Sequence, residues 1–153
     1  MKFSTFIDYS HYNVSLKYPH EWEQRKAKNE LVVVFLSPKE SESDLFRENL
    51  SVMIKKNPYQ TQNINLIIDF EIENLKNAFL NFILIEKSKN KLSKISGYRL
   101  VYSGKKKDIT FKIMQYYVLK GKRIYLITYT AQQDKFLKYK RTIKKIVKSF
   151  KIL

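Results

Sequence analysis

Two histidines are the first residues whose type could support chemistry. His11 and His20 stand nine positions apart, in stretches that resemble loops. Two His ligands on one helix face stand four residues apart, and a site built across a hairpin needs matched strand register. The spacing of these two side chains therefore indicates ordinary surface residues, and we predict that neither binds a metal.

The segment from residue 40 to residue 48 carries carboxylates, which are the ligands that calcium prefers. Its acidic residues are spaced two or four apart: Glu40, Glu42, Asp44 and Glu48. The segment lacks the glycine and the ligand order of an EF-hand loop. We therefore predict no metal site here either.

The sequence shows no arrangement for nucleophilic or acid–base catalysis. It has no cysteine, and no histidine in its second half, so Cys–His and Ser–His pairs are hard to assemble. Phosphate-binding loops, dinucleotide fingerprints and the G-x-S-x-G turn are absent. Its three glycines, at positions 97, 104 and 121, fall at predicted strand edges and turns. We predict a protein that is not an enzyme and binds no cofactor. A small metal-dependent enzyme with paired carboxylates is a third-ranked hypothesis.

The positive charge lies almost entirely in the second half of the chain. Of the net charge of +16, residues 1–76 contribute −1, from 10 Lys/Arg and 11 Asp/Glu. Residues 77–153 hold 20 Lys/Arg against Glu86, Asp108 and Asp134. Such asymmetry indicates an anionic partner, such as an acidic protein, a nucleic acid or an acidic membrane surface. The alternative interpretation is a solvated face of a lysine-rich protein.

The candidate partner-binding cations fall into three groups. They are a stripe on a predicted C-terminal helix (Lys138, Arg141, Lys145, Lys148), a first hairpin tip (Lys105, Lys106, Lys107) and a second one (Lys120, Lys122, Arg123). Spacings of three and four place the stripe on one helix face, with no acid after Asp134 in the sequence to neutralise it. The two tips end the same long strand and lie about 30 Å apart by strand rise. The sequence therefore does not imply that the three groups form one continuous groove.

Aromatic residues are interleaved with these cations, as they are in many proteins that bind single-stranded nucleic acid. They are Tyr98, Tyr102, Phe111, Tyr116, Tyr117, Tyr125 and Tyr129. Neighbours such as Tyr116 and Tyr117 must point to opposite faces of a strand, which favours core positions for most of them. Lysine greatly outnumbers arginine, which suits diffuse charge better than base readout. Nucleic-acid binding is therefore possible but not favoured.

Strands and turns dominate the predicted first third of the chain. Alternating apolar and polar residues predict two paired strands, and a continuous apolar run predicts a strand that is covered on both faces. His20 to Trp22 predicts a single helical turn that places Trp22 against the sheet. We predict strands over residues 3–9, 12–18, 30–37 and 49–56, and a surface loop over 37–47.

Two helices and an antiparallel meander are predicted for the remainder. Apolar residues recur at three and four over 62–81, with Asn63 or Asn65 as the cap and with Glu71, Glu73 and Lys76 on other faces. The last helix begins at Asp134, where a carboxylate suits the cap and the dipole. Strands are predicted from residue 82 and over 98–103, 109–119 and 123–131, with turns at 104–108 and 120–122. This α+β pattern predicts one domain over 1–153.

No run of about 18 apolar residues is present, so we predict no membrane span. The first residues lack the apolar core of a secretory signal. We therefore expect a cytoplasmic location if the N-terminus is native, and an extracytoplasmic one if a leader has been removed.

The pattern as a whole resembles the PsbP-like family, named for an extrinsic subunit of photosystem II. The most specific points are the Y-P-x-x-W turn at Tyr18, Pro19 and Trp22, the F-L-S-P segment from Phe35 to Pro38, and the Y-T-A strand end from Tyr129 to Ala131. The resemblance extends from Tyr12 to Ile152. It implies an α/β/α sandwich: a central, mainly antiparallel sheet of roughly six to eight strands, with a central helix and a C-terminal helix on its two sides.

The resemblance also implies a function. Family members are generally accessory or binding proteins without catalysis, and a nuclear adaptor of related fold binds the Ran GTPase. No visible transit segment and a strongly basic character set this chain apart from the photosynthetic members. The leading hypothesis is a binding module for an acidic protein or other polyanionic partner. Direct binding to nucleic acid or to an anionic membrane surface is the alternative.

Overall fold

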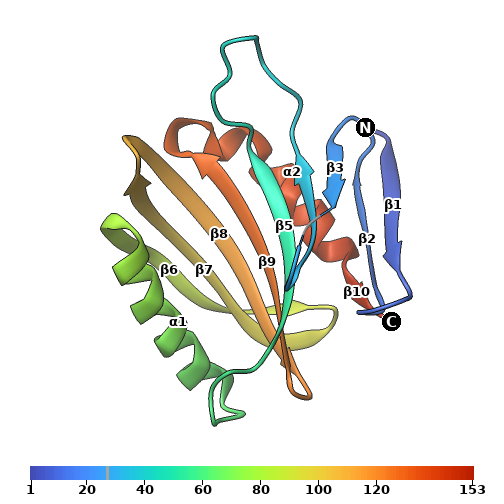
Figure 1. Cartoon of the computed structure of the whole chain (residues 1–153), viewed down its shortest axis with the longest axis vertical. Helices are drawn as coiled ribbons and strands as arrows, with labels where there is room; N and C mark the ends of the chain where they lie inside the picture. The colour runs from blue at the N-terminus through green and yellow to red at the C-terminus, as the bar shows by residue number, and fades with distance from the viewer. Residues whose placement is uncertain (27) are drawn as a thin grey trace.

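Two antiparallel sheets organise the molecule. In the computed structural model, which describes residues 1–26 and 28–153, the larger sheet has seven strands in the order β3-β4-β5-β9-β8-β7-β6 (Figure 1). Its strands are β3 (Glu23–Lys26), β4 (Leu31–Leu36), β5 (Asn49–Lys56), β6 (Leu80–Leu92), β7 (Ile95–Lys106), β8 (Ile109–Lys120) and β9 (Arg123–Gln132). This large sheet confirms the predicted central antiparallel sheet.

The small sheet has the order β1-β2-β10. It contains β1 (Phe3–Asp8), β2 (Val14–Pro19) and β10 (Lys151–Ile152). The predicted pairing of the first two strands is confirmed, from Phe3 opposite Pro19 to Asp8 opposite Val14. Strand β10 has two residues, too few for an alternating pattern, and was not predicted.

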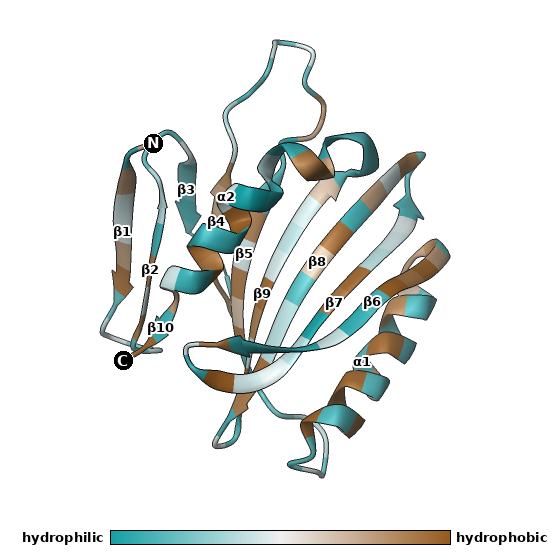
Figure 2. Cartoon of the chain, turned by 180° about the vertical axis from the view of Figure 1, so that it is seen from behind, coloured by the Kyte–Doolittle hydropathy of each residue, from teal (hydrophilic) through white to brown (hydrophobic). Residues whose placement is uncertain are grey.

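Helix α2 (Phe136–Ser149) covers one face of the large sheet, beside the small sheet (Figures 1 and 2). Its apolar stripe buries Phe136, Ile143, Ile146 and Val147. These side chains share a core with Leu16 from β2 and with residues of β5, β8 and β9. The small sheet is joined to α2 directly, because the Lys17 amide donates to Ser149 Oγ over 2.8 Å.

Helix α1 (Ile64–Ala78) covers the opposite face. Of the two predicted caps, Asn63 is the one that caps it: its side-chain oxygen accepts hydrogen bonds from the amides of Asn65 and Leu66 over 3.0 and 3.3 Å. Ile67, Ile68 and Ile72 pack against the sheet. With a helix on each face, the predicted α/β/α sandwich is confirmed. Among the described residues, no helix is long and apolar enough to cross a membrane.

The prediction that Glu71 lies on a different face of α1 from the apolar residues is wrong. Its carboxylate is buried and accepts hydrogen bonds from Lys55 Nζ over 2.9 Å and from the Tyr59 hydroxyl over 2.6 Å. A buried carboxylate requires such partners. Burial, and then the bond to Glu71, raise the pKa of Tyr59 to about 12.

Three predicted local structures are wrong. Gly104 lies inside β7 and not in the turn, and a glycine stands there because the Phe79 side chain packs where a Cβ would be. The turn is made by Lys107 and Asp108, both with positive φ. Residues 20–22 form a hydrogen-bonded turn and not a helical one, with the Trp22 amide bonded to Pro19 O. The third is the cap at Asp134. This residue lies in a 3₁₀ turn, η1 (Gln133–Lys135), and the N-cap of α2 is Lys135.

The two strands at the β3 end of the large sheet also differ from expectation. In β4, Val33 and Phe35 are buried, but the other four residues of the strand are only half-buried, so the strand is not fully covered on both faces. All four residues of β3 are exposed and polar. Because no apolar residue marks it, β3 had no periodic signal in the sequence.

Gly97 provides a test of the close packing between β7 and β8. A Cβ at this position would stand 1.9 Å from the Tyr117 carbonyl oxygen, which is backbone and cannot rotate away. We expect Gly97→Ala to reduce the free energy of unfolding by about 3 kcal/mol, measured by urea denaturation. The control is Gly121→Ala, which has open space at a φ of +60° and should lose about 1 kcal/mol. Equal losses would contradict the packing argument.

Candidate partner-binding surface

Helix α2 presents its cations to solvent, as predicted. Lys138, Arg141, Lys145 and Lys148 are all exposed, on the side away from the buried stripe. One of them is nevertheless neutralised: Lys138 Nζ lies 2.6 Å from Glu40 Oε1. The expectation of a stripe without an acidic partner is therefore wrong at its first residue, because the partner comes from a loop almost a hundred positions earlier.

Glu40 joins the loop between β4 and β5 to the start of α2. Its second oxygen lies 2.7 Å from Lys135 Nζ. Asp44, in the same loop, accepts hydrogen bonds from the amides of Glu40 and Phe46, and Glu48 is buried and accepts one from the Gln132 amide over 3.2 Å. The predicted acidic segment thus holds the chain together, and each of these three carboxylates has a structural partner.

At its C-terminal end α2 meets the β6–β7 hairpin. The Ile152 amide of β10 donates to Ser93 Oγ, at the hairpin tip, over 2.9 Å. Ser93 and Lys94 form the tip with φ of 52° and 64°, between Leu92 and Ile95, which are directly opposite each other. Positive φ is unusual for these residue types. The sequence therefore carried no turn signal here, and the tip was missed.

A cavity of about 680 Å³, open to solvent, lies at this meeting point. Four lysines line it, two from the hairpin and two from the C-terminal segment: Lys91, Lys94, Lys148 and Lys151. Val147, Phe150 and Ile152 contribute apolar surface. In the described part of the chain, no Asp or Glu lines this cavity. Lys91, Lys94 and Lys151 were not among the sequence-based candidates. Lys91 and Lys94 lie far from the α2 stripe in the sequence, and Lys151 lies just beyond the end of the helix.

The β8–β9 turn lies at the same end of the molecule. Its cations Lys120, Lys122 and Arg123 are exposed, and the Arg123 guanidinium lies over the Tyr12 ring, 5.5 Å from its centroid. The next residue, Asn13, accepts a hydrogen bond from the Leu153 amide over 2.8 Å. We use the name basic end for a group of seven cations at this end of the molecule: Lys91, Lys94, Lys120, Lys122, Arg123, Lys148 and Lys151.

The other predicted hairpin tip lies away from the basic end. Lys106 is opposite Ile109 at one end of β8, whereas Lys120 is opposite Arg123 at the other. The Lys106 ammonium lies over the Phe79 ring, 4.5 Å from its centroid. The predicted separation of the two tips is therefore confirmed, and Lys105, Lys106 and Lys107 are not brought together with the other candidates.

The interleaved aromatic residues do not form an exposed stacking surface. Six of them are buried: Tyr102, Phe111, Tyr116, Tyr117, Tyr125 and Tyr129. Tyr98 is half-buried, with Lys87 Nζ 5.3 Å from its ring centroid. Tyr116 and Tyr117 do enter opposite cores, as predicted. This arrangement does not favour single-strand binding by base stacking.

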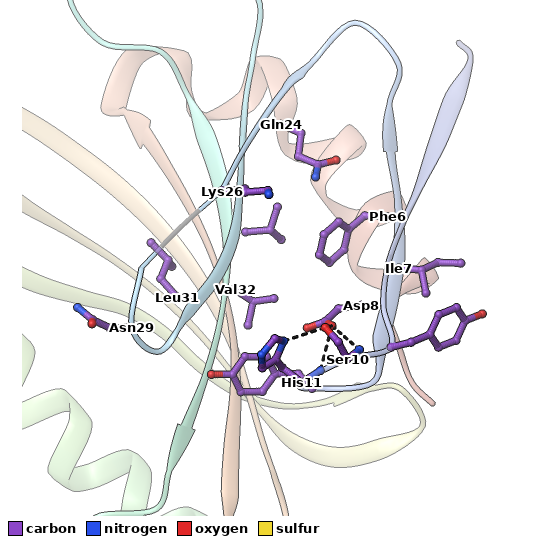
Figure 3. Close-up of a pocket in the computed structure, with 13 residues that line it drawn as sticks. Phe6, Ile7, Asp8, Ser10, His11, Gln24, Lys26, Asn29, Leu31 and Val32 are labelled. Carbon is purple, nitrogen blue, oxygen red and sulfur yellow. Dashed lines mark hydrogen bonds between the residues drawn. The ribbon is translucent and has the colours of Figure 1, made fainter.

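A hollow of about 640 Å³ beside the β1–β2 turn holds the grouping that most resembles a catalytic site (Figure 3). Ser10 Oγ lies 2.8 Å from His11 Nδ1 and donates to Asp8 Oδ1 over 3.2 Å. A catalytic triad requires the histidine to accept the serine proton and the carboxylate to orient the histidine. Here the carboxylate accepts directly from the Ser10 hydroxyl and from the Ser10 and His11 amides, which is the geometry of a capped turn.

The pKa of Asp8 is consistent with this structural role. Burial alone would raise it, but the hydrogen bonds from His11 and Ser10 lower it below its ordinary value. His20, the other histidine, bonds Ser4 Oγ over 2.8 Å. Among the residues that the structure describes, no three His, Cys, Asp or Glu side chains are grouped to hold a metal ion.

A family model described as PsbP-like protein matches residues 2–152. The chain belongs to the PsbP-like family. The match covers almost the whole sequence, which confirms the resemblance carried by the Tyr18–Trp22 turn and the Phe35–Pro38 segment. No curated protein matches the sequence.

Solved structures with this fold come from distant organisms. Cyanobacterial PsbP from Synechocystis sp. PCC 6803 is 16% identical, with a TM-score of 0.68 over 99% of this chain and 92% of that one. LpqN of Mycobacterium tuberculosis, described as involved in cell envelope biogenesis, is 12% identical, with a TM-score of 0.71 over 98% and 90%. The Ran-binding protein Mog1p of Saccharomyces cerevisiae is 11% identical, with a TM-score of 0.69 over 99% and 96%. At these identities the likeness shows the PsbP-like fold alone.

Two carboxylates of the β4–β5 loop of this PsbP-like protein should have pKa values shifted in opposite directions. Hydrogen bonds from Lys135 and Lys138 lower the pKa of Glu40 from 4.5 to about 2, whereas burial raises the pKa of Glu48 above 4.5. The Glu40 contribution to stability is therefore present above pH 4.5 and is lost as the pH falls through about 2. The Glu48 contribution has the opposite sign: it is present below pH 4.5 and is lost as the pH rises through the raised pKa.

Carboxyl NMR titration measures both midpoints, with the variant Lys135→Gln/Lys138→Gln as a test of the cause. The Glu40 midpoint should return toward its ordinary value in the variant, while that of Glu48 should remain raised. A wild-type Glu40 midpoint near 4.5 would show that the loop is not held by these two lysines.

Proposed function

We propose that this PsbP-like protein is a non-enzymatic binding or accessory module that engages an acidic protein, or another polyanionic partner, through its basic end. The observation that carries the proposal is the cavity where Lys91 and Lys94 meet Lys148 and Lys151. Like charges that converge from segments so far apart in the sequence repel one another, and a polyanion removes that repulsion. The Ran-binding protein Mog1p, a protein of the same fold, is named for a protein partner.

The chemistry of the cavity supports a protein partner over a nucleic acid. Val147, Phe150 and Ile152 give its lining an apolar part, which suits apolar side chains that stand beside carboxylates. The six buried aromatic residues are not available to stack with bases. The cations at this end are lysines, apart from Arg123, and lysine acts as a point charge more than as a reader of base edges.

The expected interaction is electrostatic and fast. An exposed ion pair contributes about 0.2–1 kcal/mol, so several pairs at the basic end give moderate affinity that decreases with salt. Complementary charge mainly raises the association rate and selects the partner. One domain over residues 1–153 and a cytoplasmic location stay predictions alongside this proposal.

Charge reversal at the basic end tests the proposal. We expect Lys148→Glu/Lys151→Glu to weaken binding to fluorescent poly-L-glutamate about ten-fold or more, because two ammonium groups of the cavity become carboxylates. The matched control is Lys2→Glu/Lys39→Glu, which changes the net charge equally. Both control lysines are exposed. Lys2 precedes β1 at the end away from the Val14–Ile152 pairing, and Lys39 lies in the loop held at the start of α2.

Fluorescence anisotropy over a salt series is the measurement, with single-stranded DNA and anionic phospholipid vesicles as competing probes. The control variant should bind poly-L-glutamate within about two-fold of wild type. Equal losses in the two variants would mean that net charge, and not the basic end, controls binding. If the basic-end variant selectively loses DNA or vesicles but not poly-L-glutamate, the nucleic-acid or membrane alternative replaces the proposal.

A further inference from the structure

Strand β6 is one edge of the large sheet, and its first half is apolar and exposed. It ends the strand order, next to β7. Leu80, Ile83 and Ile85 are 65%, 60% and 51% exposed. Figure 2 shows hydrophobic colour where β6 begins, near the end of α1. An edge strand presents backbone amides and carbonyls that can pair with another chain.

The second half of β6 is regular and basic. Register shifts interrupt its pairing with β7 between Leu80 and Ile83 and between Leu84 and Glu86, after which pairing continues without a break to Leu92. Within this regular stretch Lys87, Lys89 and Lys91 recur at every second position and are exposed. Side chains two apart on a strand share a face, so the three ammonium groups form one row.

This row lies on the α1 face of the sheet. Lys87 Nζ contacts Asn65 and Asp69 of α1, over 2.8 and 3.1 Å. Beyond that contact the first turn of α1 and the β6–β7 hairpin border a hollow of about 600 Å³, lined by Lys89 and Lys91. Its other lining residues are Asn63, Ile64, Asn65, Asn90, Ser96, Gly97 and Tyr98. The described residues around this hollow therefore include cations and amides but no carboxylate.

We propose that the β6 edge binds an extended acidic segment of the partner, which adds to the large sheet as an antiparallel strand. Its carboxylates, at alternate positions, contact Lys89 and Lys91 in the hollow. Its apolar residues cover Ile83 and Ile85. Backbone hydrogen bonds supply affinity in such strand addition, and alternate side chains supply specificity. The inference rests on the proposed function, since it takes the partner to be an acidic protein.

Charge complementarity selects this occupant over a second copy of the chain. Lysines on an edge strand and irregular pairing both discourage the association of identical edges. Two copies would also bring together chains that each carry a net charge of +16. An acidic strand instead pairs with Lys89 and Lys91, while Lys87 is already paired with Asp69. Lys91 lines both this hollow and the cavity of the basic end, so one acidic segment can pass from one site to the other.

A synthetic peptide of about ten residues tests the inference. Glu alternates with Thr in its N-terminal half and Val with Thr in its C-terminal half, so that antiparallel pairing places Glu beside the lysines. We expect Lys89→Glu/Lys91→Glu to weaken its binding about ten-fold or more, measured by fluorescence anisotropy. The Lys2→Glu/Lys39→Glu control should stay within about two-fold of wild type. An equal loss in the two variants would overturn the site.

Backbone methylation of the peptide separates strand addition from simple charge attraction. Two further peptides keep every side chain and carry N-methyl groups on alternate amides, one on the odd positions and the other on the even ones. Because only every second amide of an added strand donates to the edge, we expect one peptide to lose about ten-fold in affinity and the other to bind nearly as the parent does. Equal binding or equal loss by both peptides would overturn strand addition.

Two more measurements separate this inference from its alternatives. The basic-end variant Lys148→Glu/Lys151→Glu should keep the peptide, since neither residue lines the hollow. If that variant no longer binds poly-L-glutamate and the wild type does not bind the peptide, the inference fails and the proposed function stands. If the wild type binds no polyanion, the proposed function fails. A wild-type dimer in sedimentation that Ile83→Lys abolishes would assign the edge to a second copy and overturn the inference.

Discussion

The burial of β8 on both faces is the constraint on which the rest of the structure depends. Residues 113–118 are all buried, and successive side chains enter different cores. Tyr116 lies in the core under α2, and Tyr117 lies in the core under α1. Each face of an antiparallel sheet that is apolar must be covered. The two helices therefore have to lie on opposite sides of the same strands, and the α/β/α arrangement follows.

The same constraint decides where the charge goes. A lysine in the middle of β8 would have to leave an ammonium group in one of the two cores, which is costly without a partner. Most cations of the second half therefore lie at strand ends, at hairpin tips, on the edge strand or on the outer side of α2. Arg99, inside β7, is paired with Glu86. Several of these places coincide at one end of the molecule, where Ser93 bonds Ile152 and the C-terminal segment closes against the β6–β7 hairpin. The fold therefore brings the cations of the basic end together from separate segments of the chain.

Several acidic residues form ion pairs that join elements of the fold. Glu71 pairs with Lys55 beneath α1, and the single carboxylate of Glu40 is shared by Lys135 and Lys138 at the start of α2. The first half thus supplies carboxylates that stabilise the fold, while the far end of α2 and the hairpin tips keep their cations available. Some of the lysines are therefore held in structural ion pairs, and the others form the basic surface that is available to a polyanionic partner.

Local patterns were enough to predict most elements of this protein. Three-and-four spacing identified both helices, two asparagines at 63 and 65 marked where α1 begins, and the Gly121 turn identified the β8–β9 hairpin, because each signal depends on residues near one another in the chain. The sequence likewise established the surplus of charge in the second half. Elements without periodicity, such as the polar strand β3 and the two-residue β10, left no such signal.

Only the tertiary structure decided which charges are neutralised and which gather. The sequence counts Lys138 with the free cations and does not connect Lys94 with Lys148, because pairing with Glu40 and convergence at the cavity both join segments distant in sequence. In the sequence, Glu71 is one more polar residue on a helix, whereas in the structure the packing of α1 buries it beside Lys55 and Tyr59. Composition gives the amount of charge, whereas the distances between charges, on which their energies depend, are fixed by packing.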